Sequence, residues 1–237
     1  MSERSERTLT IDRPERRNAV DLDTLGRLAD ELDSARAAGA RVVVLTGAGG
    51  HFCSGADLGG VEDEVFVTAL WRLLDGLRSP DLVSIAAVDG VALGAGTQLA
   101  VCCDLRVATS TARFGIPAAK LGLALDHETV RRLTAFVGEG TARAMLLATE
   151  EVSGDDARRL GLVQRLGTLA DAQAWAAEIA SLAPLTIAAH KLAMERLAER
   201  ADDADVAVAR RRAWSSADLQ EGLTAFRDRR PPAFRGE

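Results

Sequence analysis

Two glycine-spaced turns in the sequence carry backbone N–H groups with few charged side chains around them. The first is TGAGGHFCSGADL at residues 46–58, and the second is GVALGAGTQL at residues 90–99. Each follows an apolar strand pattern and precedes a helical pattern. We therefore expect each turn to open a helix and to leave free N–H groups at its N-terminus, where an anion or an oxyanion binds.

Neither turn has the spacing of a nucleotide-binding loop. Leu99 and Phe52 stand where a dinucleotide-binding motif needs its third Gly or Ala, and neither turn carries the Gly-Lys-Ser/Thr of a phosphate loop. Two converging N–H donors suit a thioester carbonyl, whose oxygen gains negative charge when the α-carbon loses a proton or the β-carbon is attacked. Plain tight strand-to-helix turns are the alternative interpretation.

Strand and helix patterns alternate through the first two-thirds of the chain, and helical patterns dominate the last third. This order predicts an α/β fold with buried strands, built as one main domain with a helical extension. The expected strands are 8–11, 41–46, 85–88, 105–108, 112–116 and 162–166. The expected helices are 21–38, 61–78, one ending at 103, 128–137, 141–149, 155–160, 169–182, 185–199 and 203–228.

The composition excludes several classes of protein. Of 237 residues, 47% are hydrophobic and 27% are charged, which is ordinary for a globular domain. The net charge of -6 argues against nucleic-acid binding and against a polybasic membrane surface. An odd number of cysteines, two of them adjacent, is no disulfide framework, so we expect buried reduced thiols at Cys53, Cys102 and Cys103.

The sequence shows no targeting, membrane or metal signal. The polar N-terminus has no signal-peptide core, and the most apolar window, 82–103, is interrupted by Asp89 and Gln98. We therefore expect a cytoplasmic protein without a transmembrane segment. We expect no metal site, because the histidines do not have the spacing of metal ligands; they are His51, His127 and His190.

Several segments resemble the signature motifs of the enoyl-CoA hydratase/isomerase (crotonase) superfamily, and together they span nearly the whole chain. They are RPERRNAV at 13–20, HFCSGADL at 51–58, AAVDGVALGAGTQLAVCCDLRVA at 86–108, FGIPAAKLGL at 114–123 and ARRLGLVQRL at 157–166. The resemblance implies a ClpP-like spiral of ββα units over 1–180. It also implies a helical C-terminal trimerisation region over 181–237, with homotrimers that often pair into hexamers.

The resemblance also implies a ligand and the residues that meet it. The ligand would be a coenzyme A thioester, an acyl-CoA or enoyl-CoA, with no separate cofactor. The N–H groups of Ala56 and Ala95 would form an oxyanion hole; the family usually has Gly at the second position, and Ala95 keeps the N–H group if its φ is negative. Residues implied to meet the CoA moiety are Arg17, Ser54, Gly55, Asp57, Leu58, Phe226 and Arg229, although the arginines also suit a solvated surface.

The chain departs from the family pattern where a hydratase carries its two glutamates. Gln98 and Ala118 occupy those positions. Hydration needs one group that takes a proton from water and one that donates a proton to the α-carbon. A glutamine amide can hold water without taking its proton, and alanine can do neither, so we expect hydratase activity to be weak or absent.

Asp126 is a candidate replacement base. It falls where dienoyl-CoA isomerases and an aryl-CoA dehalogenase of the superfamily carry a catalytic aspartate, and His127 and Glu128 flank it. The alternative is structural, because Asp is a favoured N-cap and a helix is expected to begin next to it.

Three hypotheses about function follow. The first is an acyl-CoA-binding protein of fatty-acid metabolism without efficient hydratase chemistry. Segments 120–133 and 165–185 resemble an actinobacterial, mycobacterial branch depleted of both glutamates, which implies a link to mycolic-acid metabolism and to fatty-acid-synthesis enzymes as partners. The second is an active isomerase or hydratase, hence an isomerase or a lyase, that uses Asp126. The third is a structural or partner-binding protein, which would have no reason to keep an oxyanion site.

Overall fold

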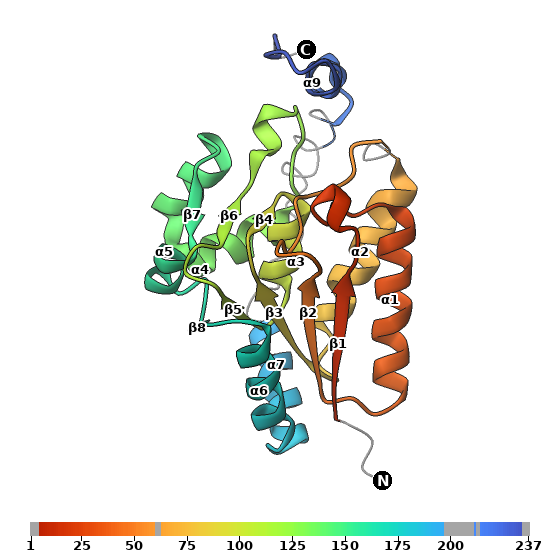
Figure 1. The fold of residues 1–237 in the computed structure, drawn as a ribbon, viewed down its shortest axis with the longest axis vertical. Coiled ribbons are helices and arrows are strands. Elements are labelled where there is room, and N and C mark those ends of the chain that lie inside the picture. Colours follow the sequence, from red (N-terminus) through yellow and green to blue (C-terminus); the bar gives the residue numbers. More distant parts are fainter. Residues whose placement is uncertain (1–4, 60–62, 197–210, 212–213, 234–237) are drawn as a thin grey trace.

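A five-stranded parallel sheet forms the centre of the molecule (Figure 1). This computed structural model describes residues 5–59, 63–196, 211 and 214–233. The strand order is β1-β2-β3-β5-β8, and all neighbouring strands run parallel. The strands are β1 (Glu6–Ile11), β2 (Val42–Gly47), β3 (Val83–Val88), β5 (Leu105–Ala108) and β8 (Arg165–Leu166).

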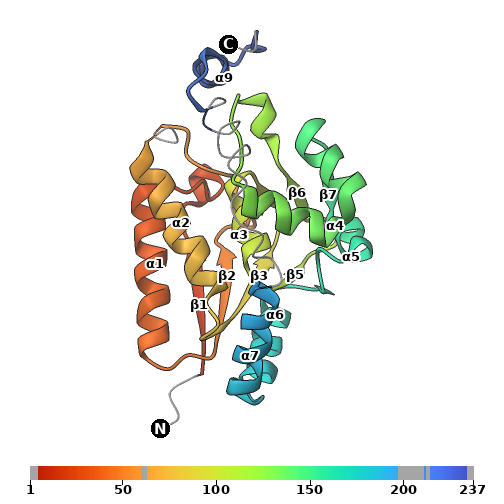
Figure 2. The ribbon, with the colours of Figure 1, turned by 180° about the vertical axis from the view of Figure 1, so that it is seen from behind.

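Helices cover both faces of this sheet (Figures 1 and 2). Alternate side chains of β2 enter two separate apolar clusters, with Val43 and Leu45 in the larger and Val42 and Val44 in the smaller. The larger cluster packs against α1 (Leu22–Ala37), α2 (Glu64–Arg78) and α3 (Ala95–Cys102). The smaller cluster packs against α6 (Leu169–Ala180), with Ile187 of α7 (Pro184–Arg196) at its margin. Burial on both faces explains the continuous apolar runs of β2 and β3.

A smaller sheet of order β4-β6-β7 stands beside the main one. Its strands are only three residues long: β4 (Val91–Leu93), β6 (Arg113–Gly115) and β7 (Glu151–Ser153). The remaining elements are η1 (Pro14–Arg16), η2 (Pro117–Lys120), α4 (His127–Leu147), α5 (Gly154–Leu160) and α9 (Ala217–Asp228). In both views α9 lies at the end of the molecule toward which β1, β2 and β3 run (Figures 1 and 2).

The expected α/β class is confirmed, with corrections to individual elements. The helices expected at 128–137 and 141–149 form one element, α4. Its backbone is non-helical at Gly138 (φ 75°, ψ 159°). The strand expected at 162–166 is reduced to Arg165–Leu166, and strands β4 and β7 were not expected. Residues 197–199 and 203–210 of two expected helices lie outside the described residues. The division at residue 180 stays a prediction.

The expectation about the cysteines is also met. Cys53, Cys102 and Cys103 are free and buried, and burial raises the pKa of each thiol to about 12. Within the described ranges, no helix is both long and apolar enough to cross a membrane.

Candidate functional site

The two glycine turns lie against each other because Cys53 joins them through its backbone. Cys53 N donates to Val91 O at 2.9 Å, and Leu93 N donates to Cys53 O at 2.9 Å. Gly96, at the start of α3, approaches so closely that a Cβ there would lie 2.2 Å from Cys53 O. The sequence therefore needs glycine at this position to bring the second turn onto the first.

Ala56 lies on the first turn, which pairs with Val20. Val20 N donates to Gly55 O at 2.9 Å, and Asp57 N donates to Val20 O at 2.8 Å. Since successive N–H groups of an extended segment point to opposite sides, this pairing directs the Ala56 N–H group away from Val20. Within the described part of the chain, no oxygen accepts it.

The expectation that the first turn opens a helix is wrong. After Ala56 the chain continues through a turn, and α2 begins only at Glu64. The N–H group of Ala56 is therefore freed by the short pairing with Val20 and not by a helix N-terminus.

Ala95 meets the condition set from the sequence. It is the first residue of α3 and has no positive φ; the preceding residue, Gly94, carries the unusual conformation with φ 53° and ψ -116°. No side chain caps this helix, and the Ala95 N–H group has no acceptor in the described residues. The free N–H groups of an uncapped first turn concentrate partial positive charge here.

The N-terminal signature holds the first turn in place. Asn18 is fully buried, and its Nδ2 donates to Ala48 O at 2.7 Å and to His51 O at 2.6 Å. Arg17 O accepts from Ser54 N at 3.0 Å, while the Arg17 side chain is exposed. Asn18 belongs to the motif RPERRNAV, but its role could not be assigned from the sequence. The structure shows that its amide binds two carbonyl groups of the first turn.

The other predicted CoA-contacting residues of this turn surround Ala56. Ser54 Oγ donates to Arg16 O at 3.1 Å, and the carboxylate of Asp57 pairs with Arg13 at 3.1 Å. Leu58 is partly buried against the core. The carboxylate of Asp57 is therefore balanced by a neighbouring guanidinium and does not face an anionic ligand as a free charge.

Gln98 and Asp126, distant in sequence, are brought into contact. Asp126 is buried and is the N-cap of α4: its Oδ1 accepts from Thr129 N at 2.8 Å, and its Oδ2 accepts from Thr129 Oγ1 at 2.6 Å. Oδ2 also accepts from Gln98 Nε2 at 2.9 Å. The structural role considered for Asp126 is thus present, together with a contact to the candidate site. Sequence reasoning missed Thr129, although Asp-x-x-Thr is a capping pattern.

Glu128, two positions after Asp126, belongs to an ion-pair network. Glu128 contacts Arg131 and Arg132 at 2.7 Å and Arg78 of α2 at 3.1 Å, and Arg132 also pairs with Glu195 of α7. Burial opposes ionisation of Glu128, but the guanidinium hydrogen bonds outweigh it and lower its pKa to about 2. A carboxylate held in this way is a poor proton acceptor near neutral pH.

Ala118 lies in η2 and offers no proton-transfer group. Its side chain is partly buried against the core, and its carbonyl accepts from Leu121 N and Leu123 N, each at 3.0 Å. Residues 121–124, which follow η2, contact the C-terminal part of the chain. Gly222 of α9 packs directly on Leu121, and Trp214 Nε1 donates to Ala124 O at 2.8 Å.

Phe226 and Arg229 lie at the C-terminal end of α9. Phe226 is 59% exposed, and Arg229 ends the helix in the left-handed conformation with φ 54°. The structure thus places both residues at the molecule's end beyond the carboxyl ends of β1–β3 (Figure 1).

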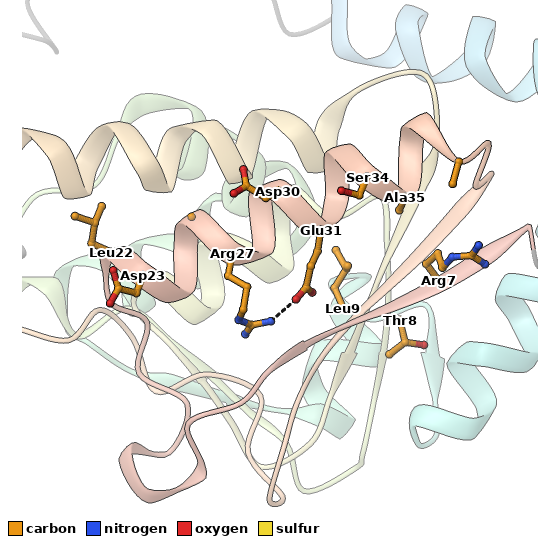
Figure 3. A pocket seen from close by; sticks show the side chains of 12 residues that line it. Arg7, Thr8, Leu9, Leu22, Asp23, Arg27, Asp30, Glu31, Ser34 and Ala35 are labelled. Atoms are coloured by element: carbon orange, nitrogen blue, oxygen red, sulfur yellow. Dashed lines mark hydrogen bonds and ion pairs between the residues drawn. The ribbon is translucent and has the colours of Figure 1, made fainter.

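A separate groove of about 990 Å³ runs between β1 and α1, at the edge of the main sheet. Arg27 and Glu31 form an ion pair at 2.7 Å inside it (Figure 3). None of the residues predicted for the site lines this groove. It is therefore a feature of the sheet edge and not part of the candidate site.

The fold and the paired turns define an α/β protein of the crotonase fold. The profile of the enoyl-CoA hydratase/isomerase family matches residues 4–237, and the chain belongs to that family. It is 43% identical to "Probable enoyl-CoA hydratase echA6" of Mycobacterium tuberculosis, covering 97% of this chain and 95% of the relative. It is 35% identical to 2,3-dehydroadipyl-CoA hydratase of Escherichia coli, covering 96% and 94%.

A solved structure agrees with this assignment. Carnitinyl-CoA hydratase from Mycobacterium avium superposes with a TM-score of 0.84 at 30% identity, covering 100% of this chain and 97% of that one. The resemblance inferred from the sequence is therefore confirmed at the level of family and fold.

Proposed function

We propose that this chain binds acyl-CoA and enoyl-CoA thioesters and adds water to them weakly or not at all. The observation that carries the proposal is the pair of unsatisfied N–H groups, Ala56 and Ala95, on two turns joined through Cys53. A thioester oxygen placed between them would receive two hydrogen bonds. The CoA thioesters in the printed names of the relatives support the same class of ligand.

Weak hydration follows from the proton-transfer positions. Gln98 offers an amide and Ala118 a methyl group where the family's hydratases carry glutamates. Each general acid or base typically contributes about 10²–10⁴-fold to the rate. With both absent, the rate falls toward the level that binding and the N–H pair alone provide.

The remaining parts of the proposal concern the CoA moiety and the assembly. The exposed side chain of Arg17 and the backbone around Ser54 and Gly55 suit the phosphates, and Phe226 and Arg229 suit the nucleotide. We further propose homotrimers or hexamers, a cytoplasmic location, and a place in fatty-acid metabolism, including mycolic-acid metabolism, with fatty-acid-synthesis enzymes as partners.

The test combines calorimetric binding of crotonyl-CoA with spectrophotometric loss of its conjugated double bond. We expect binding without measurable turnover. The Ala95→Pro variant removes one N–H group at the first helical position, where proline is well tolerated, and we expect its affinity to fall about tenfold. Ala95→Gly keeps the N–H group and is the matched control. Turnover at the rate of an efficient hydratase, or equal affinity of the Pro and Gly variants, would reject the proposal.

A second candidate function is isomerisation with Asp126 as acid and base. The contact that favours it is the 2.9 Å between Asp126 Oδ2 and Gln98 Nε2, which places a carboxylate next to the position of a missing glutamate. This function predicts shift of a double bond between enoyl-CoA isomers, abolished in Asp126→Asn while binding persists. Equal rates for the variant and the wild type would exclude it.

A further inference from the structure

The main sheet has two edges, and the strands that form them differ in length. At one edge β8 is only two residues long, whereas at the other edge β1 has six residues that pair with β2 on one side alone. A free strand edge is a place where another chain can pair, and a very short edge strand is one way in which proteins avoid this. β1 is too long for that kind of protection, so its protection must come from elsewhere.

Every second residue of β1 turns its backbone groups away from β2. Ile11 O accepts from Ala48 N at 2.9 Å, directly after β2, so the groups of Ile11 face that strand. Because the N–H and C=O groups of successive residues alternate between the two sides of a strand, those of Thr8 and Thr10 face the free edge. Within the described ranges, neither backbone group of Thr8 has a partner.

Charged side chains are confined to the first part of β1. Glu6 and Arg7 begin the strand, and charges on an edge strand discourage pairing. The next four residues, 8–11, are Thr, Leu, Thr and Ile, without a charge, a proline or a glycine. Segments of this composition pair readily with other strands. The uncharged part of β1 therefore needs protection by another element.

Arg27 of α1 reaches this uncharged part of the edge. Its guanidinium donates to Thr10 O at 3.0 Å and is held by Glu31, one turn further along α1, at 2.7 Å (Figure 3). Arg27 lines the groove of about 990 Å³ between β1 and α1, which is the space beside the strand. The guanidinium thus occupies one edge carbonyl and stands where a further strand would lie.

We propose that Arg27 blocks the free edge of β1 and prevents β1 of a second copy of this chain from pairing with it. A second copy fits this edge because Thr8 offers both a free donor and a free acceptor. With a two-fold axis beside Thr8, the N–H group of each copy would donate to the C=O group of the other. The resulting antiparallel ladder would join the main sheets of the two copies.

The charges of β1 do not prevent this pairing by themselves. In that register Glu6 lies opposite Thr10 and Arg7 lies opposite Leu9, so like charges do not face each other. The N–H group of Glu6 in one copy would then donate to Thr10 O of the other copy, which is the atom that Arg27 occupies. The contact of Arg27 is therefore incompatible with the hydrogen bond next to the centre of the ladder.

The test measures the mass of Arg27→Ala by sedimentation equilibrium at increasing protein concentration. We expect it to rise to at least twice the mass of the wild type at the same concentration. We also expect hydrogen exchange of the Thr8 amide to slow, because this N–H group becomes hydrogen-bonded. The variant should fold, since the side chain of Arg27 is 43% exposed and alanine is the best helix former.

Two further variants show which surface associates. Arg143→Ala removes a comparable exposed arginine, which pairs with Glu139 on α4 at 2.7 Å, and should keep the wild-type mass. In Arg27→Ala/Thr8→Pro, proline removes the central donor of the ladder without disturbing the pairing with β2, and edge strands accept proline. We expect this double variant to return to the wild-type mass.

Three results would overturn the inference. The first is an unchanged mass of Arg27→Ala. The second is association that persists in Arg27→Ala/Thr8→Pro, because the contact would then lie elsewhere. The third is an equal gain of mass in Arg143→Ala, which would show that loss of surface charge is sufficient. The proposed function is tested separately, because these measurements involve no thioester.

Discussion

At the scale of single residues, the proposed function attributes the weak proton transfer of the site to Gln98 and Ala118. A double variant, Gln98→Glu/Ala118→Glu, supplies two carboxylates, and we expect enoyl-CoA hydration to rise at least about 10²-fold. The gain will stay below that of an efficient hydratase, because the new carboxylate at 98 would face Asp126, and like charges disfavour ionisation of both. The measurement is the initial rate of loss of the conjugated double bond.

The control for this prediction is the single variant Ala118→Gln, which keeps the wild-type Gln98. This variant adds a side chain of the same size as glutamate without a group that takes a proton, so its rate should match the wild type. An equal gain in the control would mean that the shape of the site, and not its proton chemistry, limits the rate.

At the scale of elements, the contact between the first turn and α3 carries the geometry of the site. Gly96→Ala would place a Cβ 2.2 Å from Cys53 O, so the turns must separate. We expect a loss of about 1–3 kcal/mol in the free energy of unfolding, as for an overpacked core position, and weaker thioester binding. Urea denaturation provides the measurement.

The matched control is Gly26→Ala in α1. A Cβ at Gly26 has no neighbour within 4 Å, and the position is helical, so the variant should gain about 0.5–1 kcal/mol. Similar losses for both variants would show that the approach to Cys53 does not matter.

The ion-pair network at the start of α4 predicts an acid dependence. Because the pKa of Glu128 is lowered from 4.5 to about 2 in the folded chain, its contribution to stability is complete above pH 4.5 and is lost as the pH falls toward 2. Glu128→Gln should lower the free energy of unfolding at pH 7 by about 1.5–3 kcal/mol, with a difference that shrinks below pH 4. Denaturation over this pH range measures it, and a constant difference would contradict the prediction.

The sequence was sufficient for the longer elements and for the family, but not for the contacts. Long apolar runs and helical spacing identified β2, β3 and α1, because burial on two faces and one-sided burial leave distinct periodicities. The strands β4 and β7 are three residues long and leave no such period. Their pairing is fixed by partners distant in the chain.

The candidate site was partly predictable for the same reason. Glycine spacing is a local signal and pointed to the two turns, while the assignment of Ala56, Ala95 and positions 98 and 118 came from the resemblance to the family and stays a prediction. The contact between Gln98 and Asp126 joins α3 to α4 and leaves no local trace. The sequence also could not predict why the Ala56 N–H group is free, because this depends on the pairing with Val20, which is distant in the chain.

At the scale of the whole molecule, α7 presents apolar side chains outward. Leu185 is 85% exposed and Leu192, seven residues further along the same side of the helix, is 41% exposed, while Lys191 anchors the helix through Leu77 O, Leu82 O and Asp104 Oδ2 at 3.1, 2.8 and 2.7 Å. Exposed apolar clusters mark interaction surfaces, and a second copy of the chain is the partner we propose.

The corresponding variant is Leu185→Lys/Leu192→Lys. We expect the wild type to elute as a trimer or hexamer in size-exclusion chromatography with light scattering, and the variant to shift toward monomer with little change in secondary structure. The control, Arg143→Ala at an exposed ion pair of α4, should keep the wild-type mass. A monomeric wild type, or a variant of unchanged mass, would exclude this face as the interface.

The backbone pairing of Cys53 with Val91 and Leu93 has an evolutionary consequence. Because the hydrogen bonds of Cys53 with the second turn join main-chain atoms, substitutions at residues 98 and 118 leave these bonds in place. Under the proposed function, the proton chemistry of a hydratase can be lost by substitution at these two positions while the main-chain site for a thioester oxygen is kept. Two side-chain substitutions would then be enough to turn an enzyme of this architecture into a binding protein.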